Sequence, residues 1–421
     1  MSGPLDVLAP PRLGVGFRRL LASSWTSNLA DGIGLAAGPL LVASRTDDAF
    51  VVALAALLVW APPLVFAIPA GAVTDRLDRR LVVVTGNLVR VAVLAVLTAA
   101  VATDRVGVAA VLVALFVLGT CEVFVDNTAQ TLLPMLVHRD DLAIANARLQ
   151  VGHVTLNQLA APPLGALLFT VGHAVPFGAQ AALVLLAAVI VGRLRLPEHR
   201  RTPDELRPVW HDVVEGFRWT WHHAAVRTLV LTIFVFNLTF GAAWSVLVLY
   251  VTEHLGLGDL GYGLVTAVIA AGGLVGTLSY GWLTRRFSLA DLMRVGLVLE
   301  TLTHLALAAT SRAYVALPVF FVFGAHAFVW GTTSITVRQR AVPMHLQGRV
   351  GSVNLVGMYG GLVIGAAIGG VIAQGYGVTA PFWFAFAGSV LCCVLIWRQL
   401  GHIAHAEERA APLTEGTSRT P

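Results

Sequence analysis

The chain has 421 residues, of which 57% are hydrophobic and only 12% are charged, about half of the roughly 25% expected in a soluble domain. A water-soluble fold is excluded, because it could not hide so much apolar surface from water. The net charge is +5, but the chain has no lysine and its arginines are spread among short segments, which excludes a basic nucleic-acid-binding face.

Apolar segments of membrane-spanning length follow one another along the chain. A hydrocarbon core about 30 Å thick needs about 20 helical residues, and twelve segments reach or approach that length. They are residues 18–42, 49–70, 81–103, 107–131, 146–170, 174–192, 226–251, 260–283, 289–310, 313–336, 350–374 and 378–399. The predicted fold class is all-α: a polytopic protein of the cell membrane with twelve transmembrane helices, surrounded by lipid.

The distribution of arginine predicts the orientation. If the N-terminus is cytoplasmic, only Arg45, Arg105 and Arg312 fall on the outer side, as the positive-inside rule requires. An even number of spans then places the C-terminus in the cytoplasm too. The tail 400–421 is rich in Pro, Thr, Ser and Glu, which predicts disorder.

An internal repeat divides the chain into two halves. At an offset of 208 to 210, residues of the first half match residues of the second: Gln130 and Gln339, Pro134 and Pro343, Met135 and Met344, Asn146 and Asn354, Gly71 and Gly281. We expect two pseudo-symmetric six-helix bundles, residues 1–192 and 226–399. Parallel repeats with a substrate path between them are typical of alternating-access carriers.

The linker 193–225 joins the two halves. Val209, Val213 and Phe217 recur in it at helical spacing, which predicts an amphipathic helix. A packed connector is favoured over a helix that senses the membrane.

The loop after the second span carries the most specific motif. Its residues are Gly71, Asp75, Arg76, Arg79 and Arg80. This pattern resembles the loop motif of the major facilitator superfamily, except that Asp78 replaces a second glycine, which we expect to weaken the turn. The resemblance implies a cytoplasmic latch in which Gly71 allows close helix approach and Arg79 pairs with an acidic group, for which Asp126 is the candidate. The alternative is that these charges only anchor the loop.

Two further segments narrow the resemblance to one branch. Gln130 to Val137 and Asp212 to Arg218 are similar to segments of the enterobactin-exporter-like and macrolide-efflux-like permeases. This similarity implies export, commonly by proton exchange.

The fifth span contains Pro162, Pro163 and Gly165 in a pattern that resembles the antiporters of this superfamily. These residues would let helices pack closely and bend, and so restrict leakage; simple small-residue packing is the alternative.

Five ionisable residues are expected at membrane depth, where charges are costly and mark pathways or proton relays. They are Asp31, Arg90, Glu122, Asp126 and Glu300. Depths along the helices allow Asp31, Arg90 and Glu122 to meet. We hypothesise that Asp31 or Glu122 carries a coupling proton; the alternative is a permanent structural pair of Arg90 and Glu122. Glu300 precedes His304 by one turn, and this pair is a second candidate for titration near neutral pH. His153 and His326 are expected to be hydrogen-bonded packing residues.

The function favoured by these features is proton-coupled export of a small organic molecule, such as a drug, siderophore or secondary metabolite. Phe240, Trp244 and Trp330 are candidates to line the cavity, although packing is their default role. An uptake permease on the same fold is the nearest alternative, and a non-transporting receptor is a further one. Metal-ligand spacing and a nucleophile with a base are both missing from the sequence, so we expect no metal, no cofactor and no enzymatic activity. We expect the chain to act as a monomer.

Overall fold

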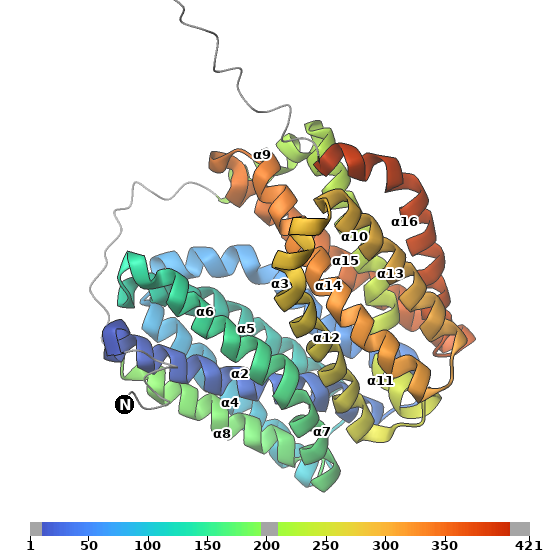
Figure 1. Ribbon diagram of the computed structural model, residues 1–421. Coiled ribbons are helices and arrows are strands. Elements are labelled where there is room, and N and C mark those ends of the chain that lie inside the picture. Colours follow the sequence, from blue (N-terminus) through green and yellow to red (C-terminus); the bar gives the residue numbers. More distant parts are fainter. Residues whose placement is uncertain (1–10, 195–208, 405–421) are drawn as a thin grey trace, which may run out of the picture.

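The structure is a computed structural model that describes residues 11–194 and 209–404, and helices make up nearly all of this part (Figure 1). In chain order the elements are η1 (Pro11–Leu13), α2 (Gly14–Ala43), α3 (Ala49–Arg76), α4 (Arg79–Ala102), α5 (Val108–Leu136), η2 (Arg139–Asp141), α6 (Leu142–Gly152), η3 (His153–Ala160), α7 (Ala161–Val171), α8 (Val175–Gly192), α9 (Val209–His222), α10 (Ala224–Trp244), α11 (Leu247–Leu249), η5 (Tyr250–His254), α12 (Gly258–Arg286), α13 (Leu289–Ala309), α14 (Ala313–Ala341), η6 (Met344–Leu346), α15 (Gln347–Tyr376) and α16 (Ala380–Ala404).

Eleven of the helical segments in the described part are long and apolar enough to cross a membrane. The remaining predicted span is α2, whose 30 residues would reach about 45 Å at 1.5 Å per residue. A polar stretch that includes Ser27, Asn28 and Asp31 makes it less apolar than the others. The prediction of an all-α polytopic membrane protein is confirmed, with helix ends within a few residues of those expected.

The helices pack in two groups, drawn mainly in blue to green and in yellow to red in Figure 1. In the first group α2 packs against α7 and α8, and α4 against α5 and α8; in the second α10 packs against α15 and α16, and α13 against α14 and α16. The groups are joined mainly by α3 with α15 and by α12 with α7 and η3, and α2 also contacts α11 and α12. Most of the predicted tail, residues 405–421, lies outside the described residues, and α16 continues to Ala404.

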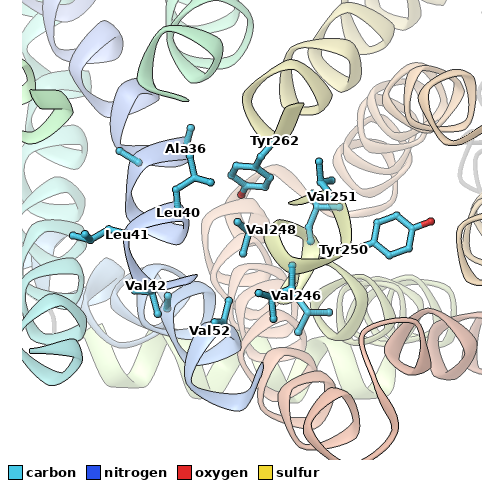
Figure 2. Packing of buried hydrophobic residues seen from close by; sticks show 14 of the residues in the cluster. Ala36, Leu40, Leu41, Val42, Val52, Val246, Val248, Tyr250, Val251 and Tyr262 are labelled. Atoms are coloured by element: carbon cyan, nitrogen blue, oxygen red, sulfur yellow. The ribbon is translucent and has the colours of Figure 1, made fainter. Parts of the chain in front are cut away.

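We call the end where α2 begins and α8 ends the linker end, and the opposite end, where α2 leads into α3, the hairpin end. At the hairpin end the two groups share one apolar core, in which Leu40 and Val52 face Val248 and Tyr262 (Figure 2). A Cβ atom added to Gly370 of α15 would lie 2.8 Å from the Cβ of Ala53 in α3. The two halves are therefore in tight contact at this end.

The linker end is different. A Cβ atom added to Gly71, Gly281, Gly348 or Gly351 would have no heavy atom within 4 Å. Two separate buried clusters lie here, one around Leu132 in the first half and one around Val350 in the second. The buried clusters at this end therefore each belong to a single half, whereas the cluster at the hairpin end is shared by both halves.

Polar caps explain where several helices begin. The side chain of Asp48 accepts hydrogen bonds from the backbone N–H groups of Phe50 and Val51 at the start of α3. Asp78 accepts one from Leu81 at 3.0 Å and so caps α4. Asp78 has φ −60°, which any residue adopts. The expectation that Asp78 weakens this turn is therefore wrong, because an N-cap aspartate stabilises a helix start.

The linker helix α9 lies against the start of α15. Glu215 forms an ion pair with Arg349 at 2.6 Å, and a Cβ atom on Gly216 would lie 2.6 Å from the carbonyl oxygen of Arg349. Phe217 and Trp221 are exposed, and the side chain of Val213 lies outside the described part. One side of α9 thus packs against α15, and the choice between a packed connector and a helix that senses the membrane stays a prediction.

Candidate functional site

A cavity of about 540 Å³ lies between the two halves, within the usual range for a site that holds a small molecule. Helices of both halves line it, mainly α2 to α5 from the first and α10, α12 and α14 from the second. Leu40, Val52, Val248 and Tyr262 close it toward the hairpin end. A single compartment therefore touches both repeats.

One wall of the cavity carries a buried ion pair. Arg90 of α4 donates from Nη2 to Oδ1 of Asp31 in α2, with side chains 4% and 10% exposed. Arg90 also donates to Oδ1 of Asn87 at 3.1 Å, and Ser27 donates to Oδ2 of Asp31 at 3.2 Å. Arg90 is thus paired with Asp31 and not with Glu122. The structural pair of Arg90 and Glu122, which was the alternative, does not form in this structure. Additional hydrogen bonds are what a buried pair needs to offset its desolvation.

Glu122 of α5 faces the same cavity beside this pair. In the described ranges it has neither an ion pair nor a hydrogen bond through its side chain. It also lines a smaller pocket of about 80 Å³ that extends toward the linker end, together with Asn28, Asp126 and His153. Glu122 therefore joins the cavity to a polar path. The three charged residues predicted to lie together, Asp31, Arg90 and Glu122, line the same cavity.

The opposite wall is aromatic. Phe240 and Trp244 of α10 line the cavity as predicted, with Phe236, Phe323 and Phe328 beside them. Phe240 stacks on Trp244 with ring centroids 4.5 Å apart, and Trp60 approaches Phe240 from the other half at 6.4 Å. Trp330 does not line the cavity; it is 5% exposed and stacks behind Phe236 at 4.9 Å.

Behind the aromatic wall lies a second buried cluster of titratable groups. Nε2 of His304 is 3.0 Å from Oε1 of Glu300, and Nε2 of His326 is 3.2 Å from Oε2 of the same carboxylate. The three side chains are 0%, 1% and 4% exposed for His304, Glu300 and His326. His326 is therefore not the lone packing histidine that was expected. His153 is hydrogen-bonded to Asn28 at 3.0 Å, as expected of a packing residue.

The predicted antiporter-like segment lies where α7 meets its neighbours. The turn before Pro162 and Pro163 is a π-helix, η3, because proline lacks an N–H and clashes with the preceding turn. A Cβ atom on Gly165 would lie 2.5 Å from the carbonyl oxygen of Ile33, and one on Gly263 of α12 would lie 2.8 Å from that of Pro162. This segment thus brings α2, α7 and α12 into close contact.

The predicted latch residues lie at the linker end. Arg79 donates to Sδ of Met135 at 3.0 Å, and Arg80 to the carbonyl oxygen of Leu194 at 3.2 Å. Arg76 and Asp126 are exposed, and no ion pair between Arg79 and Asp126 occurs in the described part. The side chain of Asp75 lies outside the described residues. Both of these hydrogen bonds stay within the first half.

The comparisons with known proteins agree with this architecture. The family model of transmembrane secretion effectors matches residues 6–414. The chain belongs to this family of the major facilitator superfamily. Its relatives include the multidrug efflux pump Tap of Mycolicibacterium fortuitum, 29% identical over 86% of this chain and 90% of the relative. Macrolide efflux protein A of Streptococcus pyogenes is 23% identical over 84% and 87%.

Solved structures show the same fold. A bacterial homologue of the iron transporter ferroportin superposes with a TM-score of 0.73 at 17% identity, covering 91% of this chain and 98% of that chain. The nucleoside transporter NupG gives a TM-score of 0.75 at 12% identity, covering 91% and 99%. This member of the transmembrane secretion effector family is therefore a multi-pass membrane transporter and not an enzyme.

Proposed function

We propose that this transporter exports small, largely apolar organic molecules across the cell membrane in exchange for protons. The observation that carries the proposal is Glu122, a carboxylate without an ion-pair partner in the described part, set opposite an aromatic wall in a cavity between two repeats. The names of its relatives, a multidrug efflux pump and a macrolide efflux protein, support export.

The linker end faces the cytoplasm in this proposal. Arginines gather at that end, and the positive-inside rule places such segments in the cytoplasm. The cavity is then closed to the outside by the shared core at the hairpin end. Rocking of the halves would open the hairpin end and close the linker end, with Gly71, Asp75, Arg76, Arg79 and Arg80 at the closing surface.

Glu122 is the group that exchanges the proton. Asp31 is held by Arg90, so Glu122 is the carboxylate left to accept either a proton or a polar group of the substrate. A substrate bound from the cytoplasm leaves outside when a proton takes its place on Glu122. The polar pocket with Asn28, Asp126 and His153 then gives the proton a route to the cytoplasm. Aromatic side chains of the facing wall hold the apolar part of the substrate.

Everted membrane vesicles test this proposal with ethidium as the probe. With the cytoplasmic face outside, an exporter accumulates ethidium when a proton gradient is imposed and loses it when a protonophore collapses the gradient. Glu122→Gln should lose the gradient-driven part of the accumulation. Glu253→Gln, an exposed glutamate at the hairpin end, is the matched control and should behave as the unaltered protein. Gradient-driven accumulation only in right-side-out vesicles would indicate an uptake permease and refute the proposal.

A further inference from the structure

We propose that Glu300, His304 and His326 form a second proton-binding site, behind the substrate cavity, whose occupancy positions the aromatic wall. The existence of this site does not depend on the proposed exporter function. Only its effect on substrate transport rests on that function. It concerns a cluster in the second half of the chain, on α13 and α14. The charged groups assigned above to proton exchange are all in the first half.

The geometry shows where a proton would go. Nε2 of His304 is hydrogen-bonded to Oε1 of Glu300 at 3.0 Å. Nε2 of His326 lies 3.2 Å from Oε2 of the same carboxylate, an ion-pair distance without hydrogen-bond geometry. The Nδ1 atoms of His304 and His326 are buried and have no hydrogen-bond partner among the described residues. With both imidazoles neutral and the carboxylate ionised, the cluster holds one uncompensated negative charge, which is costly in a membrane interior. One added proton on either imidazole makes the cluster neutral.

Other charges do not replace that proton. The helices packed against α13 are α14 and α16. Apart from His326, their titratable side chains in the described part are Tyr314, Arg338, Arg340, Cys392 and Cys393. None of these groups, nor Arg227 on α10, forms an ion pair with Glu300 within the described ranges. The charge balance of the site is therefore set by the two histidines and the glutamate alone.

The site touches the substrate cavity through two rings. His304 lies edge-on to Trp244, with centroids 5.9 Å apart at 84°. His326 lies edge-on to Phe323, with centroids 5.4 Å apart at 83°. Trp244 and Phe323 contact each other at 4.4 Å and line the cavity on their other side. A positive charge on an imidazole changes its electrostatic interaction with an aromatic ring whose centroid lies within about 6 Å, so a proton on the cluster changes how these two rings are held.

The emission of Trp244 reports the site without any substrate. A protonated imidazole quenches an adjacent indole, so protonation of His304 should lower the emission of Trp244. The measurement uses purified protein in lipid nanodiscs, and the contribution of Trp244 is the difference between the emission of each protein and that of its Trp244→Phe counterpart. We expect a single step in this emission as the pH is lowered and the cluster takes up its proton. His304→Gln should lose the step. His173→Gln, which alters an exposed histidine of the first half, is the matched control and should keep it.

Three outcomes would overturn the proposal: no step in the unaltered protein, a step that persists in His304→Gln, or a step that is also lost in His173→Gln. If His304→Gln does not fold, His326→Gln takes its place, and the step should be diminished. The vesicle assay is independent of this measurement. Ethidium transport that fails while the step is present would refute the exporter and leave the proton site standing, whereas transport without the step would refute only the site.

Discussion

Replacing Gly370 by alanine should shift the protein away from the conformation that is closed at the hairpin end. The new Cβ atom would lie 2.8 Å from the Cβ of Ala53, whereas carbon atoms in good contact are about 3.5–4.0 Å apart. Because Ala53 is on α3 and Gly370 on α15, the clash is relieved by moving the two halves apart. Overpacking of this kind costs about 1–3 kcal/mol, which changes the ratio of two conformations by roughly 5- to 150-fold.

Gly375→Ala is the control for this change. It lies on the same helix and has no heavy atom within 4 Å of the new Cβ atom. Any gain in helix propensity from glycine to alanine, up to about 1 kcal/mol, acts in both conformations and in both variants. Only Gly370→Ala adds a contact between the halves.

The assay is the distance between two spin labels at the hairpin end. Asp47→Cys and Tyr376→Cys place them on exposed positions of the two halves, in a chain whose Cys121, Cys392 and Cys393 have been replaced by alanine. Pulsed electron resonance should show a larger population at long distance for Gly370→Ala than for Gly375→Ala. Identical distance distributions for the two variants would refute the reasoning, because the close approach of α3 and α15 would then not limit closure.

Two further changes test the local interactions. Asp31→Asn should lower the free energy of unfolding by about 3–5 kcal/mol, since it leaves the buried Arg90 without its charge partner. The double variant Asp31→Asn with Arg90→Met should recover part of that loss. Thermal unfolding in detergent measures both variants, and equal destabilisation by the single and double variants would contradict the pairing. Asp78→Ala should cost about 1 kcal/mol through the lost cap of α4, and Asp78→Gly only a few tenths. The same unfolding assay compares them, and an equal loss in the two variants would show that the cap is not the cause.

The helices of this chain were predictable because their signal is local. An uncharged run has to be about 20 residues long to cross a membrane, and the breaks between runs show where each helix stops. The span expected at residues 289–310 is α13, Leu289–Ala309. Asp78 was misjudged for the opposite reason: the motif suggested a glycine turn, while the structure uses the side chain as an N-cap.

The partners within the membrane were less predictable. Depth along a helix, which the sequence gives, correctly placed Asp31, Arg90 and Glu122 near one another. It does not give the rotation of each helix about its axis, and that rotation decides that Arg90 meets Asp31. For the same reason His326 could not be paired with Glu300: its helix, α14, had to be docked on α13 before the two could meet. The spacing of His304, one turn from Glu300, was the only part of this cluster visible in the sequence.

The positions of the glycines connect the repeat with the proposed motion. Gly71 in α3 and Gly281 in α12 occupy equivalent places in the two repeats, and both face open space at the linker end. The same two helices make the contacts between the halves at the hairpin end, where Gly263 of α12 and Gly370 of α15 would each clash if they carried a Cβ atom. When the halves rock as rigid bodies, two helices that join them and separate at one end must approach each other at the other end. No contact in the present conformation requires a glycine at position 71 or 281, because both positions face open space. Glycine at these positions therefore suits a second conformation, in which α3 and α12 approach their partners at the linker end.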